Sequence, residues 1–590
     1  MKKFFLVTTA DYKTWSTDES ILFLGEWCKI YSDKEKWEKL NSEVVPYSWD
    51  NRQQLYKDHI YLDKLYEKVL TEITKILNKV HGTQYSKMYW RIIIGPWLLI
   101  FIPIIFERFN QVSFAVKNYT ITSTKIYSFE LEDMIPHDMN QFANFFMGDK
   151  WNQLIYSFII KSIGAISYDI VQEKYNQPQV SERRVSLKKR FSNALLMILS
   201  GVKKDIFFAD ISLFWKDRLK LFFKHGIFVE NFHNTDLSGL KTDKESRQWM
   251  IDLKSTNDFE KFLFNIIPKQ LPKAYLEGFQ FINKLNKLKS ALIRNPRFIF
   301  TSQITYNDWF KFWVAEKKEK GAKLLIAQHG GGYGVAKWFS NEGHELKVSD
   351  YFFSWGWRDK KRPSVIPLGI WTRNKFEKRN NYRQKNALIV LGATPRYSYK
   401  MYSETVSSQW LNYFNDQCIF ICSLSDELRS KLIVRLYPYD YGWNDEKRIK
   451  DIFPDVCLAN PDRSMSKLSK ESRVIISTYN STTFLETLSK NIPTIIFWDP
   501  KFWELRPEAL ADFNKLKKVG ILHDSPISAA DHLEQVWEKT ELWWNSYDTQ
   551  KVVKEFVKTY CFRPPNLIDE MVKKVEEIPL KSQKEGVPFT

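Results

Sequence analysis

Residues 472–500 read SRVIISTYNSTTFLETLSKNIPTIIFWDP, and this stretch decides the fold that the sequence predicts. It opens with a β-branched apolar run at 474–476, which predicts a buried parallel strand. A hydroxyl-rich loop at 477–483 follows, and then apolar residues at helical spacing, Phe484, Leu485 and Leu488. Pro493 leads into a second apolar run at 494–497. Strand, polar turn, helix and strand form the unit of an open α/β sheet.

The start of the helix in this unit suits a phosphate. Ser481, Thr482 and Thr483 supply hydroxyls there, and the first helical N–H groups are free. Glu486 follows about one turn later, where its carboxylate could accept hydrogen bonds from ribose hydroxyls. Ligands of open α/β sheets bind beyond the carboxyl ends of the strands. The unit therefore predicts a nucleotide-sugar site of the kind found in two-domain glycosyltransferases.

Composition describes a large globular protein with a basic surface. The 590 residues allow two or more domains, and 44% are hydrophobic. The 22 Trp are consistent with saccharide stacking, although large cores explain them more simply. Five cysteines indicate no disulfide scaffold and fit a reducing compartment. The apolar part of MKKFFLVTTADY is too short for a signal peptide.

A net charge of +19 and a pI near 9.3 point to an anionic partner. No zinc-finger, RNP or basic-heptad pattern is present, so we expect an anionic membrane surface and no nucleic acid, with a merely solvated basic surface as an equal alternative. Residues 92–106 (IIIGPWLLIFIPIIF) are uncharged but short of the ~20 residues that span a bilayer. They predict a buried helix pair, with interfacial insertion as the alternative and no transmembrane segment. We expect a cytoplasmic protein, peripheral at the inner face of the cytoplasmic membrane.

Alternating strand and helix patterns predict a doubly wound α/β protein of the GT-B-like class, in which two Rossmann-like domains face a cleft. Residues 1–371 form the expected N-terminal, acceptor-side domain, with a strand-poor helical insertion at about 78–179. Residues 372–385 form a linker, 386–550 the C-terminal nucleotide-sugar-binding domain, and 551–590 a C-terminal helix and tail. The expected strands are 4–8, 21–24, 205–208, 227–230, 298–301, 324–327, 351–353, 387–391, 419–421, 432–436, 474–476 and 494–497. The expected helices include 52–77, 141–163, 186–199 and 274–288.

Two motifs of the N-terminal half follow predicted strands. QHGGGYG at 328–334 places His329 where it could act as a general base or a phosphate ligand, and Gly330 and Gly331 let backbone N–H groups approach an anion. A structural histidine in a tight turn is the alternative. FLGEWC at 23–28 places Glu26 as a candidate base for the acceptor hydroxyl. Helix capping or ion pairing by Glu26 is equally compatible with the sequence.

Two motifs of the C-terminal half also follow strands. GATPRYS at 392–398 contains Arg396, which could reach a phosphate across the cleft. VRLYPYDYGW at 434–443 offers Arg435 and the Tyr437–Pro438 pair to the nucleotide if its strand is central. An ordinary surface arginine is the alternative at Arg435.

These motifs, with YWRIIIGPWL at 89–98, SWGW at 354–357 and STYNSTTFLE at 477–486, resemble transferases encoded in bacterial O-antigen loci, over residues 3 to about 550. More remotely, the QHG loop and the Pro-containing strand end resemble capsule enzymes that transfer Kdo or other ulosonic acids from CMP-activated donors. In those enzymes a His-Pro pair and a Ser/Thr pair hold the CMP, whereas Tyr437 stands in place of the histidine here.

The resemblance implies transfer of a sugar, an ulosonic acid from a CMP-linked nucleotide-sugar donor, to a lipid-linked or oligosaccharide acceptor in O-antigen or capsule synthesis. It implies no cofactor and no metal, since no DxD motif is present, and phosphate charge would be offset by arginines and helix N-termini. An alditol-phosphate transferase with a CDP-activated donor is the alternative within enzymes. A non-catalytic polysaccharide export or scaffold protein is the alternative outside them.

Overall fold

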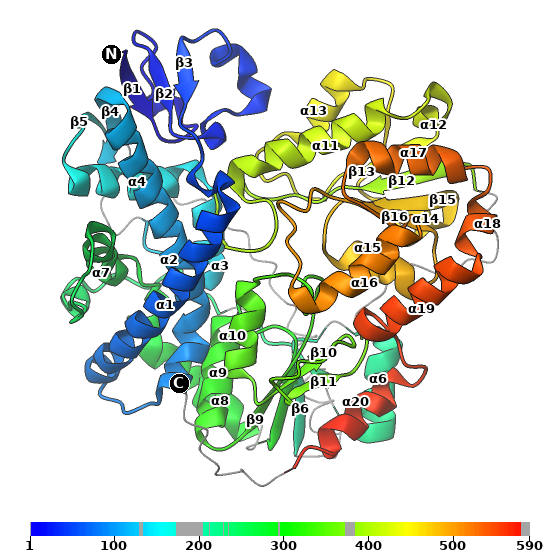
Figure 1. The fold of residues 1–590 in the computed structure, drawn as a ribbon. Coiled ribbons are helices and arrows are strands. Elements are labelled where there is room, and N and C mark those ends of the chain that lie inside the picture. The colour runs from blue at the N-terminus through cyan, green and yellow to red at the C-terminus, as the bar shows by residue number, and fades with distance from the viewer. Residues whose placement is uncertain are drawn as a thin grey trace.

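A computed structural model describes residues 2–128, 134–172, 205–211, 213–227, 229–233, 235–292, 296–371 and 384–579. Three parallel sheets occupy three corners of the molecule (Figure 1). The predicted helix at 186–199 and nearly all of the predicted linker at 372–385 lie outside the described residues.

The N-terminal sheet has the strand order β3-β2-β1-β4-β5, with every neighbouring pair parallel. It consists of β1 (Lys3–Val7), β2 (Ile21–Phe23), β3 (Ser42–Val44), β4 (Thr120–Ser128) and β5 (Ser167–Gln172). Between these strands the chain forms α1 (Arg52–His81), α2 (Lys87–Asn118), α3 (Met139–Met147) and α4 (Asp149–Ile163). The prediction that 4–8 and 21–24 share a sheet with 205–208 was therefore wrong. The expected insertion at 78–179 is not purely helical, because it contains β4 and β5. Most residues of these strands are half-exposed or exposed, with Thr124, Ile126 and Tyr127 of β4 as buried exceptions, so the strands lack the apolar run that marks a buried strand.

The middle sheet has the order β11-β10-β9-β8-β6-β7 and is also parallel. Its strands are β6 (Ile206–Ala209), β7 (Val229–Glu230), β8 (Phe298–Thr301), β9 (Lys323–Ala327), β10 (Tyr351–Ser354) and β11 (Val365–Pro367). Its helices are α6 (Trp215–His225), α7 (Asp258–Gln270), α8 (Phe279–Leu292), α9 (Asp308–Glu319) and α10 (Ser340–Val348). The strand order reverses between β6 and β8, which makes this the place where an open sheet binds a ligand.

The C-terminal sheet has the order β14-β13-β12-β15-β16-β17, the 3-2-1-4-5-6 order of a dinucleotide-binding fold. Its strands are β12 (Asn386–Val390), β13 (Leu432–Arg435), β14 (Cys457–Leu458), β15 (Ser472–Ser477), β16 (Thr494–Phe497) and β17 (Leu522–His523). Its helices are α11 (Trp410–Cys422), α12 (Asp426–Ser430), α13 (Asp445–Ile452), α14 (Met465–Glu471), α15 (Thr482–Ser489), α16 (Pro507–Lys518), α17 (Pro526–Val536) and α18 (Thr540–Trp544). Residues 419–421 belong to α11, so the strand predicted there was wrong. The side chains of Trp410, Tyr413, Phe414, Gln417, Phe420 and Ile421 are buried at helical spacing.

The middle and C-terminal sheets are the two Rossmann-like domains that the sequence predicts, and the GT-B-like α/β class is confirmed. After α18 the chain continues into α19 (Tyr547–Tyr560), which packs on α15 and α16. It then returns to the middle domain, where Ile370 N–H donates to the carbonyl of Phe562 at 2.8 Å and α20 (Leu567–Glu576) packs on α6. The chain thus crosses between the two domains twice.

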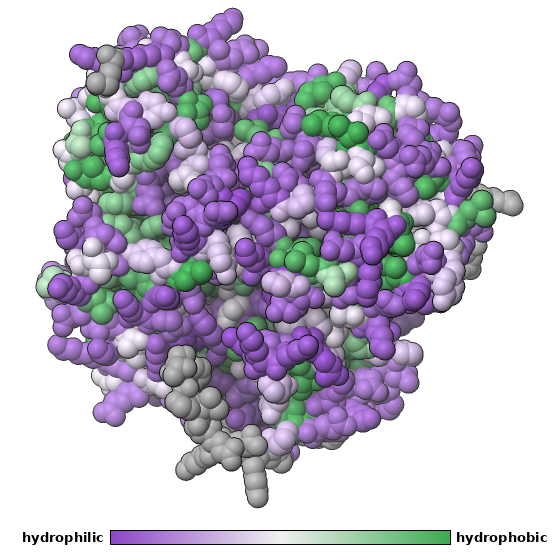
Figure 2. Space-filling model, in the orientation of Figure 1, coloured by the Kyte–Doolittle hydropathy of each residue, from purple (hydrophilic) through white to green (hydrophobic). Residues whose placement is uncertain are grey.

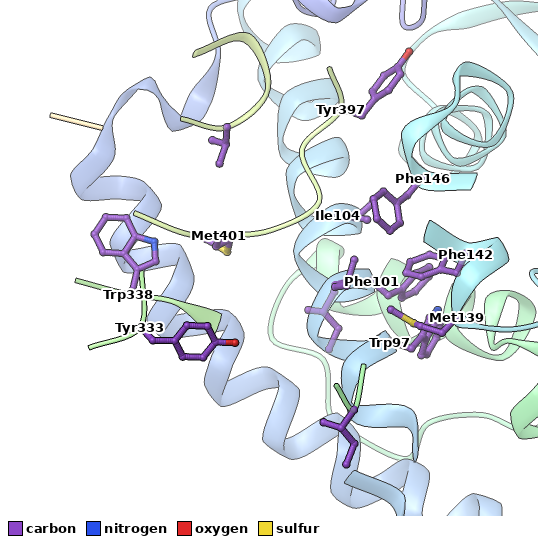
Figure 3. Close-up of a cluster of buried hydrophobic side chains, with 14 of the residues drawn as sticks. Trp97, Phe101, Ile104, Met139, Phe142, Phe146, Tyr333, Trp338, Tyr397 and Met401 are labelled. Atoms are coloured by element: carbon purple, nitrogen blue, oxygen red, sulfur yellow. The ribbon is translucent and has the colours of Figure 1, made fainter. Parts of the chain in front are cut away.

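Helix α2 is the only helix of the described ranges that is long and apolar enough to cross a membrane. It is one continuous helix with Pro96 and Pro103 inside, so the predicted helix pair was wrong. In its most apolar stretch 94% of the residues are buried. Trp97 and Phe101 pack against Phe142 of α3, with both ring centroids 6.2 Å away (Figure 3). The face in Figure 2 is mostly hydrophilic, with apolar residues in scattered patches. Helix α2 is therefore a buried core helix. The side chains packed around it keep it helical despite Pro96 and Pro103.

Candidate functional site

The cleft between the two Rossmann-like domains closes where the loop after β9 meets the start of α15. The Gly331 N–H donates to the Thr482 Oγ1 at 3.1 Å. A Cβ on Gly331 would lie 2.3 Å from the carbonyl carbon of Ser481, so only glycine allows this approach. The sequence predicted these motifs for opposite sides of the cleft, and the structure brings them into contact.

A cavity of about 230 Å³ lies at this junction. Its walls come from α2, the middle domain and two loops of the C-terminal domain. They are formed by Ile100, Tyr306, His329, Gly330, Gly331, Gly332, Tyr333, Ala336, Phe339, Asn341, Tyr399, Lys400, Tyr402, Ser403, Glu404, Asn480 and Ser481. We call it the cleft cavity. Val390 of β12 lies opposite Ser477 of β15, so the loops after these strands leave the switch point of the C-terminal sheet side by side.

Asn480 is a site residue that the sequence analysis missed. Its side chain lines the cleft cavity and is only 6% exposed. Neither its amide nitrogen nor its amide oxygen has a hydrogen-bond partner among the described residues. A buried amide without partners is costly, and a ligand in the cavity would supply them. Its position between Ser477 and Ser481, in the same loop as the predicted hydroxyls, was the available signal.

His329 lines the same cavity, with its Nδ1 3.5 Å from the Tyr333 hydroxyl and 3.8 Å from Glu345 Oε1. Burial lowers the pKa of His329 to about 4, and burial raises the pKa of Glu345 to about 8. At neutral pH the imidazole is therefore uncharged and Glu345 is largely protonated. Because Nδ1 faces Tyr333 and Glu345, Nε2 is the nitrogen available to a ligand.

A second cavity, of about 300 Å³, lies at the switch point of the middle sheet and shares Tyr306 with the cleft cavity. Asp210 lines it directly after β6. The backbone of Asp210 has φ = 47°, an uncommon conformation for a residue other than glycine, and its Oδ1 accepts from Phe232 N–H at 3.0 Å. Burial raises the pKa of Asp210 to about 7. The sequence analysis did not select Asp210, although an acidic residue directly after a buried strand is a visible signal.

Glu26 lies elsewhere. It begins a short turn after β2, in the N-terminal sheet, and its Oε2 lies 2.8 Å from Lys29 Nζ. Burial lowers the pKa of Arg448 on α13, in the C-terminal domain, and the Glu26 carboxylate partly offsets this by raising it. Glu26 does not line either cavity. The strand before Glu26 belongs to a separate sheet, so its role as the base stays a prediction that these two cavities do not support.

The two predicted phosphate-binding arginines are already engaged. Arg396 is 5% exposed, and its guanidinium donates to Asp149 Oδ2 at 2.7 Å and to the carbonyl of Trp27. Arg435 donates to the carbonyls of Asn460 at 2.9 Å and Pro461 at 3.0 Å. Neither arginine lines the cleft cavity. Arg396 holds the N-terminal sheet region against the C-terminal domain.

The remaining predicted residues lie near the cleft but outside the walls of its cavity. Tyr437 is 43% exposed and Pro438 follows it in an exposed loop. Burial is the main cause that raises the pKa of Tyr479 to about 12. The nearby Tyr437 hydroxyl adds to this rise. Thr483 Oγ1 lies 2.7 Å from the Tyr479 hydroxyl. Glu486 is buried in α15 and is not part of the cavity wall.

Comparison with protein families decides the class of this chain. Residues 4–575 match the model of the LIC12162 family transferase. The chain belongs to the LIC12162 family of transferases. This confirms the predicted transferase over nearly the whole chain. Among curated proteins, no sequence matches it.

Solved structures similar to this chain include MurG of Acinetobacter baumannii, at 12% identity and a TM-score of 0.33, covering 65% of this chain and 95% of that one. WaaG, a glycosyltransferase involved in lipopolysaccharide biosynthesis, has 11% identity and a TM-score of 0.29, covering 63% and 98%. The glycosyltransferase SsfS6 of Streptomyces sp. SF2575 has 10% identity and a TM-score of 0.29, covering 63% and 99%.

Proposed function

We propose that this transferase is a glycosyltransferase that holds a nucleotide-sugar donor in the cleft cavity and transfers the sugar to a glycan acceptor. The contact between the QHGGG loop after β9 and the first turn of α15 carries the proposal. It joins the carboxyl-end loops of two Rossmann-like sheets around one cavity. Such a cleft suits a ligand with a nucleotide on one side and a reacting sugar on the other.

Three features of the C-terminal side suit a phosphate. The N-terminus of α15 opens at Ser481, and the buried Asn480 amide has unmet hydrogen-bonding capacity. Lys400 lines the cavity next to Glu404. Burial disfavours the Lys400 charge, but the Glu404 carboxylate outweighs burial and holds the Lys400 pKa above its ordinary value. These groups would stabilise negative charge on the departing nucleotide.

The middle domain supplies candidates for acceptor activation. In the proposed reaction an acceptor hydroxyl oxygen bonds to the anomeric carbon, and the bond from that carbon to the donor phosphate oxygen breaks. The electron pair leaves with the nucleotide, and the hydroxyl proton passes to the Asp210 carboxylate. Asp210 lies at the switch point of the middle sheet with a pKa raised by burial to about 7, which suits a base at neutral pH. His329 would donate from its neutral ring to the donor phosphate.

The finer assignment rests on the motif resemblance. We assign the donor as a CMP-linked ulosonic acid and the pathway as bacterial O-antigen or capsule synthesis, with a lipid-linked or oligosaccharide acceptor. Transfer of alditol phosphate from a CDP-activated donor is the alternative. Product analysis separates the two, because both reactions release CMP but only alditol-phosphate transfer leaves phosphate on the product.

Nucleotide binding tests the proposal. We expect CMP or another nucleotide at 100 times its Kd to stabilise the chain by about 2.7 kcal/mol in thermal unfolding. Asn480→Asp places a carboxylate against the phosphate and should weaken binding at least tenfold. Asn514→Asp adds the same charge on an exposed residue of α16 and should not weaken it. Absence of stabilisation by CMP, CDP, UDP, GDP and dTDP, or equal affinities in the two variants, would refute the proposed site.

We also propose that the enzyme associates peripherally with anionic membranes through α6. Trp215, Leu219 and Phe223 are 63%, 44% and 78% exposed and lie on one face at i, i+4 and i+8. Lys216, Lys220 and Lys224 follow the same spacing beside them, and the last two share an ion pair with Asp569 of α20. An aromatic and aliphatic face flanked by lysines suits the headgroup region of an anionic bilayer.

A further inference from the structure

A third cavity, of about 440 Å³, lies on the other side of Phe339 from the cleft cavity. Helices α1 and α2 form one wall, and α10 with the segment before it forms the other. The turn between β10 and β11 and Arg506 complete its rim. We call it the α1–α10 pocket. Because Phe339 lines both cavities, a long ligand could occupy them together.

Flat aromatic rings form one side of the α1–α10 pocket. The rings of Tyr56 and Trp338 have centroids 5.1 Å apart, and His59 stacks on Trp338 at 6.4 Å. Figure 3 shows Trp338 beside α1, near Met401. Trp338 is 5% exposed, and Lys337 Nζ lies 4.6 Å from the centroid of the Tyr56 ring. A sugar ring would therefore place its C–H face against the exposed parts of these rings, beside Lys337.

Polar groups without partners lie in the same pocket. His344 is 5% exposed, and neither of its ring nitrogens has a hydrogen-bond partner within the described residues. The Nε1 of Trp338 also lacks one. Pro103 has no N–H to offer the Leu99 carbonyl, which therefore lacks its usual helical donor. Burial, aided by nearby cations, lowers the pKa of His344 to about 3, so its neutral ring has one donor and one acceptor. This mixture of donors and acceptors matches sugar hydroxyls.

The pocket carries excess positive charge. Five basic and three acidic side chains line it, which leaves two positive charges in excess. The basic ones are Lys337, Lys347, Lys361, Arg362 and Arg506, and the acidic ones are Asp63, Glu342 and Asp359. Arg506 pairs with Glu342 at 2.9 Å, and Lys347 pairs with Asp63 at 3.0 Å. Lys361 and Arg362 are exposed and form no ion pair with any carboxylate of the described chain. An anionic group on the ligand would meet these two side chains.

We propose that the α1–α10 pocket binds a saccharide that carries a carboxylate or phosphate group. The sugar ring would lie on Tyr56 and Trp338, its hydroxyls would bond to His344, and its anionic group would face Lys361 and Arg362. That this saccharide is the acceptor, reaching past Phe339 into the cleft cavity, rests on the proposed glycosyltransferase function. The proposal that the pocket binds such a saccharide does not rest on that function.

Saturation-transfer NMR on the full chain, without nucleotide, tests the proposal with glucuronate, glucose 6-phosphate and glucose as probes. Inorganic phosphate, which has no C–H protons to observe, is added as a competitor of glucose 6-phosphate. We expect saturation of the ring protons of both anionic sugars and at least fivefold weaker binding of glucose. K361A/R362A should weaken the anionic sugars at least fivefold. R358A/K360A is the matched control, since it removes two exposed charges from the same turn outside the pocket, and should leave binding unchanged.

His344→Gln should weaken the charged and the neutral sugar alike, because it changes a hydroxyl partner and no charge. Absence of binding by both anionic sugars at millimolar concentration would overturn the proposal. Equal losses in the two double variants, or phosphate binding as tightly as glucose 6-phosphate, would also overturn it. Nucleotide binding to the same sample is measured separately, so failure of the cleft proposal and failure of this one are distinguishable.

Discussion

Replacing Gly331 with alanine should force the two Rossmann-like domains apart at the cleft. The added Cβ would lie 2.3 Å from the carbonyl carbon of Ser481 and 2.6 Å from its Cα and carbonyl oxygen. All three are backbone atoms of the turn that begins α15, so no side chain can rotate away. The backbone at Gly331 does not have a positive φ, so the effect of alanine is steric.

The size of the effect follows from the distance. Carbon atoms pack at about 3.5–4.0 Å, so the loop or the helix must move by at least about 1.2 Å. Overpacking of this kind costs about 1–3 kcal/mol. If the nucleotide binds only the closed arrangement, its apparent affinity falls by up to the same free energy, or about 5- to 150-fold.

Calorimetric titration of CMP, or of whichever nucleotide binds, into Gly331→Ala measures this loss. Gly343→Ala is the control, because a Cβ there meets no atom within 4 Å. We expect the control to bind like the parent. If Gly331→Ala also binds like the parent and unfolds at the same temperature, the contact between the glycine loop and α15 does not form the nucleotide site.

Three further predictions follow from single features. Asp210→Asn should lower kcat about 10²- to 10⁴-fold. In the parent, kcat/KM should rise with pH through about 7, where the Asp210 carboxylate forms. A kcat/KM that does not change with pH would exclude Asp210 as the base. Because burial raises the pKa of Asp210, the native state keeps a proton that the unfolded chain loses between about pH 4 and 7. The free energy of unfolding in urea should therefore fall as the pH rises through this range. Asp210→Asn should make this dependence on pH weaker. Arg396→Ala should destabilise the chain by roughly 1–3 kcal/mol, because Asp149 loses its ion pair and keeps the hydrogen bonds from the Tyr397 hydroxyl and the Ala10 N–H. A phosphate-binding arginine would instead lower nucleotide affinity with the melting temperature kept. Trp215→Ser with Phe223→Ser should reduce sedimentation with phosphatidylglycerol vesicles at low salt, while Leu542→Ser, equally exposed on α18, should not; retention of the parent on vesicles at high salt would contradict a peripheral, charge-assisted contact.

Local patterns in the sequence were sufficient for most of the strands and for the unit that contains the site. The apolar runs at 298–301, 324–327, 474–476 and 494–497 are strands β8, β9, β15 and β16 within two residues at each end. Buried parallel strands are continuous apolar runs, and a helix after a hydroxyl-rich turn has its own capping chemistry, so both can be recognised without neighbours. The sequence predicted His329, Gly330 and Gly331 for one side of the cleft and Ser481 and Thr482 for the other, because ligands bind beyond the carboxyl ends of parallel strands. The contact between Gly331 and Thr482 was not predicted.

Tertiary structure decided which sheet each strand joined and which polar groups were left for a ligand. Glu26 and Arg396 have the residue types and strand-end positions of a site, yet a separate N-terminal sheet places Glu26 beside Lys29 and commits Arg396 to Asp149. Asn480 and His344 are ordinary polar residues in the sequence, and only packing leaves them buried with no hydrogen-bond partner in the described parts of the chain. A strand's apolar pattern is a property of a few consecutive residues. The sheet that a strand joins and the partner of a side chain such as Arg396 depend on residues far away in the chain, which no local pattern contains.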